Sequence, residues 1–337
     1  MSTLRLSFAC GRYDRTEPIR TGQIKPDGID LTYLTIKPAD GFARMLKNQE
    51  FDASEMSISL YLMFKLSGNV SFTAIPVFTM RRFFHTELIV NTGSGIEKPS
   101  DLKGKRIGVP EYGMSLALWI RGILQHEFDV QPEDLEWYVE RSPGESVADA
   151  IGFKPPDNVS VHQIPKDSDV TTMLNEGAID AAFPLPRFWR TRTDRIKDVP
   201  PLGPGSKIKR LFPDPKLEAI RYFKNTGFFP INHIVVIQDH VLKENPWVAR
   251  SLFDAFELSK TISYEDASAT SEEPTNLVWQ GQLWEEVHRI MGGDPFPYGV
   301  KKNEKILREL AGYSYEQRLA PRRAEIVDLF TSTMLDT

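Results

Sequence analysis

Apolar and polar residues follow one another along the chain in short blocks of two kinds. Segments with apolar residues three and four positions apart, typical of helices, occur at 39–49 and from Met114 to His126. Compact apolar runs, typical of buried strands, lie between such segments, at 4–10, 29–36, 51–56, 72–78, 86–91, 106–110, 135–140, 159–165 and 230–237. This alternation predicts βαβ units around mostly parallel sheets.

The strand–helix rhythm occurs twice, which predicts two lobes. The first group of elements ends near Asn91, and a late strand after Pro230 brings the chain back, followed by a mainly helical tail. We therefore expect one lobe from 1–91 plus 231–337 and the other from 92–230, with a cleft where strand ends meet. A stretch rich in Pro, Gly and Lys before the late strand, at 196–216, is predicted to be irregular.

Composition excludes some classes of partner. The 337 residues include 46 acidic and 41 basic side chains, a formal charge of −5, which argues against a nucleic-acid or anionic-membrane surface. Cys10 is the single cysteine, so an internal disulfide is excluded. The start of the sequence has no apolar run of the length found in secretory signals, and no segment approaches the ~20 apolar residues of a membrane span. We expect a cytoplasmic protein.

An unusual group of charges precedes the apolar run at 88–90. Arg81, Arg82 and His85 stand at the mouth of a segment that is predicted to be a buried strand. One interpretation is a solvated loop end, and the other is a cleft that holds an anion. Because neighbours in an extended segment point to opposite faces, we expect one arginine of the pair in the cleft, Arg81, and the other in solvent.

Several stretches carry a resemblance to a known family. The stretch "DLKGKRIGVPEYG" (101–113) is similar to the start of the second lobe in type II periplasmic-binding-protein folds. The chain further resembles the 4,5-dihydroxyphthalate decarboxylase family, in order along nearly its whole length, through "ACGRYDRT", "FDASEMS", "IPVFTMRRFFHT", "GVPEYGMSLALWIRGIL", "IDAAFPLPR", "PINH" and "DPFPYGV". The resemblance implies an α/β, two-lobed type II periplasmic-binding-protein-like fold: two mixed sheets flanked by helices, with a cleft between the lobes.

The same resemblance implies an aromatic-acid decarboxylase. Three positions depart from the family pattern: Phe84 stands in place of a basic residue, Gly113 in place of a glutamine-like one, and "AAFPLPR" (181–187) in place of a Ser-Pro-Arg arrangement. If these positions contact the ring substituents, the substrate is a related aromatic acid and not 4,5-dihydroxyphthalate itself.

Decarboxylation of a dihydroxyphthalate has simple chemical requirements. Each carboxylate is para to a phenolic hydroxyl, so removal of that phenolic proton enriches the carboxyl-bearing carbon in electrons. Protonation of this carbon and loss of carbon dioxide follow. The ring is its own electron sink, so we expect no metal or other cofactor. The protein must supply a base, an acid and groups that bind two carboxylates.

Two histidines and a glutamate are the candidate catalytic residues. His85 is the first choice, because an imidazole both accepts and donates a proton near neutrality. His233 begins the late strand and is either a second acid–base group or a histidine that bonds to backbone. Glu55 follows a strand, where it either accepts hydrogen bonds from the catechol hydroxyls or orients His85, or else caps the next helix.

The candidate substrate-binding residues are cations and a helix start. A planar guanidinium binds a carboxylate through two parallel hydrogen bonds. The amides and dipole at the start of the helix near 114 favour an anion. We expect substrate contacts from Arg12, Asp14, Ser57, Arg81, Tyr112, Gly113, Met114, Ser115 and Arg187.

Two other functions remain as alternatives. A solute-binding protein for an aromatic or other organic acid needs no acid–base pair, and the lack of a leader weighs against it. A different lyase on this scaffold, such as the dehydratases of menaquinone biosynthesis, resembles the chain less in motif. No metal-ligand spacing, dinucleotide loop or phosphate loop is present in the sequence. We expect a small aromatic carboxylate as partner and leave a homo-oligomer open.

Overall fold

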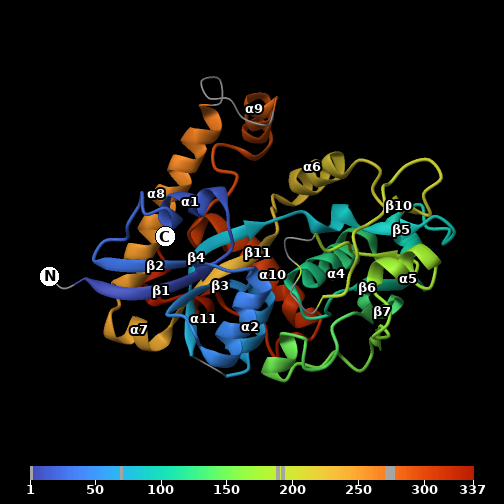
Figure 1. The fold of residues 1–337 in the computed structure, drawn as a ribbon, viewed down its shortest axis with the longest axis horizontal. Helices are drawn as coiled ribbons and strands as arrows, with labels where there is room; N and C mark the ends of the chain where they lie inside the picture. Colours follow the sequence, from blue (N-terminus) through green and yellow to red (C-terminus); the bar gives the residue numbers. More distant parts are fainter. Residues whose placement is uncertain (1–2, 69–70, 187–189, 191–193, 270–277) are drawn as a thin grey trace.

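Two α/β lobes make up the molecule. The structure, a computed structural model, describes residues 3–68, 71–186, 190, 194–269 and 278–337. Figure 1 shows the lobes side by side, one formed by the blue N-terminal and the orange and red C-terminal elements, the other by the green and yellow middle of the chain. The predicted α/β fold with two mixed sheets is confirmed.

The first sheet has the strand order β2-β1-β3-β11-β4. Strands β1, β2 and β3 are parallel, whereas β11 runs antiparallel to both β3 and β4. The strands are β1 (Leu4–Cys10), β2 (Ile29–Thr35), β3 (Ala53–Ser57), β4 (Phe72–Arg81) and β11 (Ile231–Gln238). As a result, the carboxyl ends of β1, β3 and β4 and the amino end of β11 lie at one edge.

The second sheet has the order β10-β5-β9-β6-β7-β8. Its strands are β5 (Ile89–Asn91), β6 (Arg106–Val109), β7 (Glu136–Val139), β8 (Ser160–Gln163), β9 (Ala181–Ala182) and β10 (Ile208–Arg210). Strand β5 pairs with β9 and β10, so it belongs to the second sheet. The lobe boundary expected after Asn91 assigns this strand to the first lobe instead. Strand β10 lies inside the stretch predicted to be irregular, because an edge strand of three residues leaves little apolar pattern.

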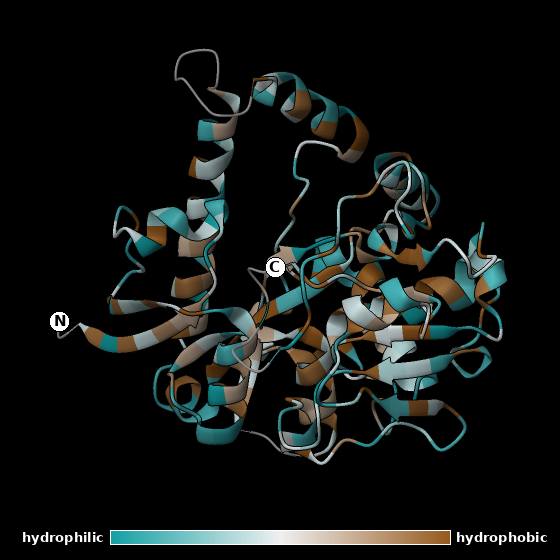
Figure 2. Cartoon of the chain, turned by 45° about the vertical axis from the view of Figure 1, so that its right-hand side comes forward, coloured by the Kyte–Doolittle hydropathy of each residue, from teal (hydrophilic) through white to brown (hydrophobic). Residues whose placement is uncertain are grey.

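Helices cover both sheets. They are α1 (Glu17–Arg20), α2 (Pro38–Asn48), α3 (Ile58–Leu66), α4 (Ser115–Phe128), α5 (Val170–Glu176), α6 (Pro215–Thr226), α7 (Asp239–Glu244), α8 (Val248–Ser268), α9 (Gln280–Met291), α10 (Glu304–Glu316) and α11 (Ile326–Leu329). Figure 2 shows apolar residues concentrated in the strands and on inner helix faces, with polar residues on the outside. Among the described residues, no helix is long and apolar enough to cross a membrane.

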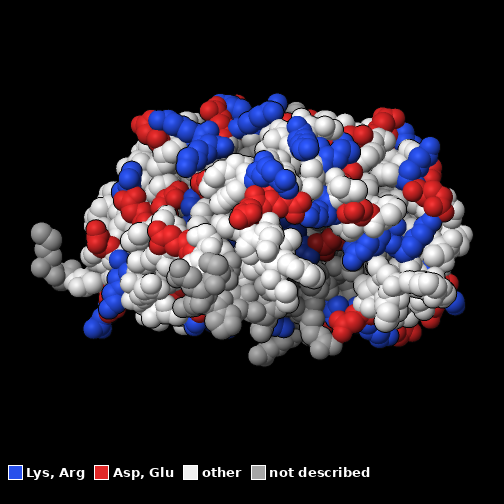
Figure 3. All heavy atoms as spheres, turned by 90° about the horizontal axis from the view of Figure 1, so that it is seen from above, with Lys and Arg blue, Asp and Glu red and all other residues white. Residues whose placement is uncertain are grey.

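Close packing joins helices of the two lobes. Gly122 of α4 lies against the ring of Tyr313 of α10, where an added Cβ would come within 2.1 Å of the ring. Trp119, also of α4, donates a hydrogen bond from Nε1 to the carbonyl oxygen of Ile231 at 2.6 Å. These contacts fix the start of α4 close to the amino end of β11. Seen from above, the outer face carries acidic and basic side chains intermixed (Figure 3).

Candidate active site

A cavity lies between the lobes, at the edge where the strands of the first sheet end. It encloses about 580 Å³ free of protein atoms, part of it open to solvent. Residues from both lobes line it. The first sheet and its helices contribute Pro38, Ala39, Phe42, Ser57, Leu60, Met80, Asn232 and His233. The chain that follows β4 and forms the second lobe contributes Phe84, Glu111, Met114, Ser115, Leu116, Arg141, Val147 and Leu185. Most of these side chains are apolar, and the polar ones are few and buried.

Glu55 lies beneath this cavity, on β3 in the middle of the first sheet. Its side chain is 1% exposed. Oε1 accepts hydrogen bonds from Tyr13 Oη at 2.5 Å, from His233 Nδ1 at 2.6 Å and from Thr79 Oγ1 at 2.9 Å. Oε2 accepts from Gly11 N at 2.8 Å and from Cys10 Sγ at 3.5 Å. Five donors therefore surround one carboxylate.

The ionisation states in this cluster follow from that arrangement. Burial by itself would raise the pKa of Glu55, but the charge and hydrogen bond of His233, with the bonds from Tyr13 and Gly11, lower it overall. Burial and the negative charge of Glu55 raise the pKa of Tyr13 well above its ordinary value. The same two causes raise the pKa of Cys10. Glu55 is thus an anion, and Tyr13 and Cys10 keep their protons beside it.

The carboxylate fixes the protonation pattern of His233. Because an ionised carboxylate only accepts hydrogen bonds, Nδ1 of His233 must carry the proton that it shares with Glu55. In the neutral imidazole, Nε2 then has the free lone pair. His233 lines the cavity, and the ring of Phe42 packs edge-on against it at 4.9 Å between centroids. This pair has the arrangement of a histidine base held in one tautomer by a buried acid.

Two helix starts meet at the cavity. Ser57, which caps α3, and Ser115, the first residue of α4, contact each other through their hydroxyl oxygens at 2.7 Å. Met114, at the N-cap position of α4, provides no side-chain cap. The first turn of α4 therefore presents backbone amides and a positive dipole end beside the cavity, which suits an anion.

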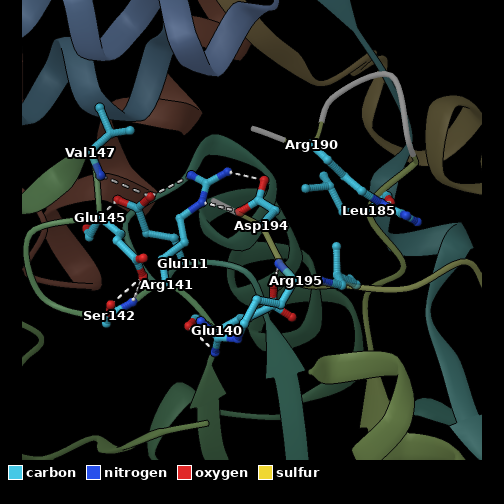
Figure 4. A network of polar contacts seen from close by, with 12 residues as sticks. Glu111, Glu140, Arg141, Ser142, Glu145, Val147, Leu185, Arg190, Asp194 and Arg195 are labelled. Carbon is cyan, nitrogen blue, oxygen red and sulfur yellow. Dashed lines mark hydrogen bonds and ion pairs between the residues drawn. The ribbon is translucent and has the colours of Figure 1, made fainter. Parts of the chain in front are cut away.

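Arg141 is the cationic side chain that lines the cavity. Nη1 donates to Glu111 at 2.8 Å, while Nε and Nη2 donate to Asp194 at 2.7 and 3.0 Å (Figure 4). Burial opposes its charge, but Asp194 and Glu111 raise the pKa of Arg141 overall. Glu111 also accepts from Ser146 Oγ and Ala148 N, both close to 2.8 Å, which fixes the network. Within the described part of the chain, three of the five N–H donors of Arg141 have an acceptor, which leaves two for a ligand.

Asn232 contributes a polar atom that has no hydrogen-bond partner among the described residues. It is fully buried and lines the cavity, and its Nδ2 donates to the carbonyl oxygen of Pro230 at 3.0 Å. Its Oδ1 is buried and makes no hydrogen bond within the described structure. A buried amide oxygen normally has a donor. A hydroxyl group of a ligand would satisfy it.

The structure brings five of the sequence candidates to this site. Glu55 lies beneath the cavity, and His233, Ser57, Met114 and Ser115 line it. Phe84 and Leu185 also line it, so two of the three departures from the family pattern border the same space. Arg187, the last residue of the third departure, lies outside the described residues.

His85 does not reach the cavity. Its side chain is fully buried in the short helix η2 (Phe84–Glu87), among the rings of Phe83, Phe212 and Tyr222. Its Nε2 lies 3.4 Å from Glu218 of α6, and burial lowers the pKa of His85 despite this carboxylate. The expectation that His85 is the first proton-transfer group therefore lacks support from its position, because η2 turns its ring away from the substrate space.

The predicted cationic clamps also lie elsewhere. Arg81 is buried but points away from the cavity, since Met80, the preceding residue of the extended strand, lines it. Arg12 is an exposed side chain 3.5 Å from Glu17, and Asp14 is exposed in a short turn.

Two further predicted substrate-binding residues, beside the start of α4, do not line the cavity. Tyr112 is buried under the guanidinium of Arg121, 3.8 Å from its ring centroid. Gly113 packs against Ala148, where an added Cβ would come within 2.9 Å of the Ala148 Cβ. A glutamine-like side chain at 113 would not fit there without a shift.

Sequence reasoning missed several residues of the site. Tyr13 and Thr79 lie inside the quoted motifs "ACGRYDRT" and "IPVFTMRRFFHT", and Asn232 lies inside "PINH". Their roles depend on strands that are distant in the sequence. Arg141 had a local signal: it follows β7 at a carboxyl end, where ligands of α/β sheets bind.

Comparison with known proteins identifies the family of this chain. A 4,5-dihydroxyphthalate decarboxylase of Comamonas testosteroni is 29% identical over 343 residues, covering 100% of this chain and 99% of that protein. One of Pseudomonas putida is 34% identical over 183 residues, covering 54% of this chain and 71% of that protein. The chain belongs to the 4,5-dihydroxyphthalate decarboxylase family. The resemblance seen in its motifs is thereby confirmed.

The fold of this decarboxylase family member is that of a periplasmic binding protein. Residues 25–198 match the family described as "ABC transporter, phosphonate, periplasmic substrate-binding protein". Among solved structures, the periplasmic aliphatic sulphonate binding protein SsuA of Escherichia coli is similar, with a TM-score of 0.53, 10% identity and 99% of both chains covered. A putative sulfonate-binding SsuA of Methylobacillus flagellatus KT has a TM-score of 0.53 at 11% identity, covering 100% of this chain and 94% of that one. These similarities show the fold.

Proposed function

We propose that this protein decarboxylates a hydroxylated aromatic dicarboxylic acid, 4,5-dihydroxyphthalate in the first instance, to protocatechuate and carbon dioxide. The observation that carries the proposal is the Glu55–His233 pair beside a cavity between two lobes. A protein that only binds a solute has no need of a buried carboxylate that fixes a histidine tautomer. The names of the two relatives support the same reaction.

Binding of the substrate dianion uses the second lobe. One carboxylate is received by the two unused N–H donors of Arg141, and the other by the first turn of α4 with the hydroxyl of Ser115. The catechol end then faces the first lobe, where Asn232 Oδ1 accepts one phenolic hydrogen. The apolar wall, which includes Phe42, Leu60 and Phe84, contacts the ring.

His233 performs the first proton transfer. Its Nε2 takes the phenolic proton para to the leaving carboxylate, and Glu55 stabilises the imidazolium that forms. Electron density moves to the carboxyl-bearing carbon, which is protonated, and carbon dioxide leaves. The phenolate of the product takes its proton back from Nε2. The overall reaction consumes one proton, the one added to the ring, and this proton originates from solvent.

The reaction requires no cofactor in this scheme, because the ring stores the electron pair between the two proton transfers. The expectations of a cofactor-independent enzyme and of a cytoplasmic location belong to the proposal. The solved structures that resemble the fold are named as periplasmic proteins, so location needs its own measurement.

The test is incubation of purified protein with 4,5-dihydroxyphthalate in D₂O, with and without a chelator. We expect protocatechuate with one deuterium at the ring position vacated by carbon dioxide, formed at the same rate in both samples. His233→Asn should abolish turnover, whereas His85→Gln, a change to a histidine outside the cavity, should preserve it.

Other results would change the conclusion. Loss of activity in His85→Gln with retention in His233→Asn would reverse the assignment of the base. Inhibition by the chelator would contradict the cofactor-independent scheme. Absence of product, together with tight binding of the dicarboxylate, would favour the solute-binding alternative.

A further inference from the structure

A second cavity lies where the chain returns from the second lobe to the first. It encloses about 740 Å³ free of protein atoms, part of it open to solvent, and shares no lining residue with the first cavity. The end of α6, the segment 227–229 that leads to β11, the loop after α9 and the start of α10 surround it. Arg81, which the proposed reaction does not use, lines this cavity.

Arg81 is a buried cation without an acidic partner. The residue is 7% exposed. Nη1 donates to the carbonyl oxygen of Phe229 at 3.0 Å, and Nη2 donates to that of Pro297 at 2.9 Å and to Asn303 Oδ1. Two of its five N–H donors, Nε–H and one on Nη1, have no acceptor among the described residues, and no described carboxylate comes within 4.0 Å. Burial lowers the pKa of Arg81 to about 9, and the carboxylate of Asp294, which is not in contact with it, offsets this only in part.

Further positive groups surround the same space. Lys302 and Lys305 line the cavity, and both are exposed. Asp294 also lines it, but Lys260 Nζ at 3.1 Å, Lys302 Nζ at 3.5 Å and Tyr264 Oη at 3.0 Å already occupy its carboxylate. Helix α10, thirteen residues long, begins here, and its N-cap residue Asn303 makes no side-chain cap bond to it. The positive end of the helix dipole therefore adds to the charges of three cations.

The remaining walls are apolar. Phe228, Phe229, Met291 and Ile306 line the cavity together with two prolines. Phe229 stacks on Phe83 at 4.6 Å between ring centroids, which holds its ring in place. A cavity with one cationic end and aromatic walls suits a ligand that has an anionic group on a flat apolar body.

We propose that this second cavity is a binding site for a small aromatic carboxylate, with the carboxylate on Arg81 and the start of α10 and the ring between Phe228, Phe229 and Met291. The site goes beyond the proposed decarboxylation and does not depend on it. Its walls include the segment that runs directly into β11, so an occupied site would restrain the strand that carries His233.

Benzoate is the probe, and calorimetric titration is the measurement. We expect Lys302→Glu/Lys305→Glu, which reverses two exposed charges, to raise the Kd at this site by about tenfold. Lys301→Glu is the matched control, since Lys301 is an exposed lysine directly before Lys302 that does not line the cavity. Arg81→Gln should raise the Kd by tenfold or more.

A crystal soaked with 4-bromobenzoate distinguishes the two cavities, because anomalous scattering locates the bromine. Bromine beside Phe228 supports the proposal. Bromine between the lobes alone, or a Kd that neither Lys302→Glu/Lys305→Glu nor Arg81→Gln changes, overturns it. If Arg81→Gln does not fold, the double lysine variant decides. Decarboxylation assays run on the same variants report separately on the proposed function.

Discussion

At the scale of single residues, Glu55 organises the candidate active site. Its five donors come from β1, the turn after it, β4 and β11, and each of these is a neutral or cationic group that favours a carboxylate over a carboxylic acid. The charge has no direct access to a substrate. Its effect reaches the cavity through the imidazole of His233.

Glu55→Gln tests this role. A glutamine keeps the size of the side chain but removes the charge that stabilises an imidazolium, so kcat should fall by about 10²- to 10⁴-fold with little change in KM. Steady-state kinetics with 4,5-dihydroxyphthalate measure both constants. Glu50→Gln, at an exposed carboxylate paired with Arg44, is the control. A large rise in KM at constant kcat would mean that Glu55 acts in binding.

At the scale of elements, helix starts and short turns decide which groups face the substrate. Helices α3 and α4 belong to different lobes, and their starts meet at the cavity through Ser57 and Ser115. The short helix η2, by contrast, turns His85 into an aromatic cluster against α6. The position of each of these side chains follows from the residue at which its helix begins and from the direction of that helix.

Ser115→Ala should weaken substrate binding without removing the helix start. The hydroxyl donates one hydrogen bond, which is typically worth about 0.5–1.5 kcal/mol, so we expect KM to rise about two- to tenfold. Competitive inhibition by phthalate, which keeps both carboxylates and lacks the hydroxyls, measures the effect on binding alone. Ser268→Ala, at the exposed end of α8, serves as the reference. An unchanged inhibition constant would exclude the hydroxyl from the anion site.

His85 should make stability depend on pH. Burial lowers its pKa in the folded protein below the ordinary value of 6.5, so the unfolded chain binds a proton first as the pH falls. The stability present above pH 6.5 is therefore lost as the pH falls from 6.5 towards the folded pKa. Glu218, whose pKa is lowered to about 2, adds its own loss only below its ordinary value of 4.5.

Urea unfolding of the wild type and His85→Gln at pH 7.5 and 5.5 measures this effect. The drop in unfolding free energy should be smaller in the variant by up to about 1 kcal/mol, since the glutamine does not titrate. An equal drop in unfolding free energy in the two proteins would mean that His85 has the same pKa in the folded and the unfolded chain. Decarboxylation at pH 7.5 should be unaffected, which separates stability from catalysis.

At the scale of the whole molecule, the site exists only because two lobes meet. Glu55 and His233 belong to the first sheet, whereas Arg141 and the start of α4 belong to the second lobe. A ligand that contacts both lobes favours their approach over their separation. Closure would also exclude water from the proton transfers.

Hydrogen exchange should report this approach. Bound phthalate is expected to slow exchange of backbone amides in both 57–60 and 114–117, which lie at the starts of α3 and α4 in different lobes. Mass spectrometry of peptides from these segments, with and without phthalate, measures the protection. Peptides from α7, whose residues line neither cavity, should be unchanged. Protection confined to one lobe would contradict a ligand held between the two.

The sequence by itself determined the kind of fold and part of the site. Apolar periodicity located most strands and helices, and the motifs indicated the family. Glu55, Ser57 and Ser115 stood out because strand ends and helix starts are recognisable locally. These features depend on residues near one another in the chain.

The tertiary structure alone decided which groups meet. Antiparallel pairing of β11 with β3 sets His233 opposite Ser57 and Val235 opposite Glu55, and this register brings His233 rather than His85 to the carboxylate. The direction of β4 sends Met80 to the first cavity and Arg81 to the second. In strands, a shift of one residue moves a side chain to the other face. Long-range strand pairing fixes that register, and no local pattern encodes it.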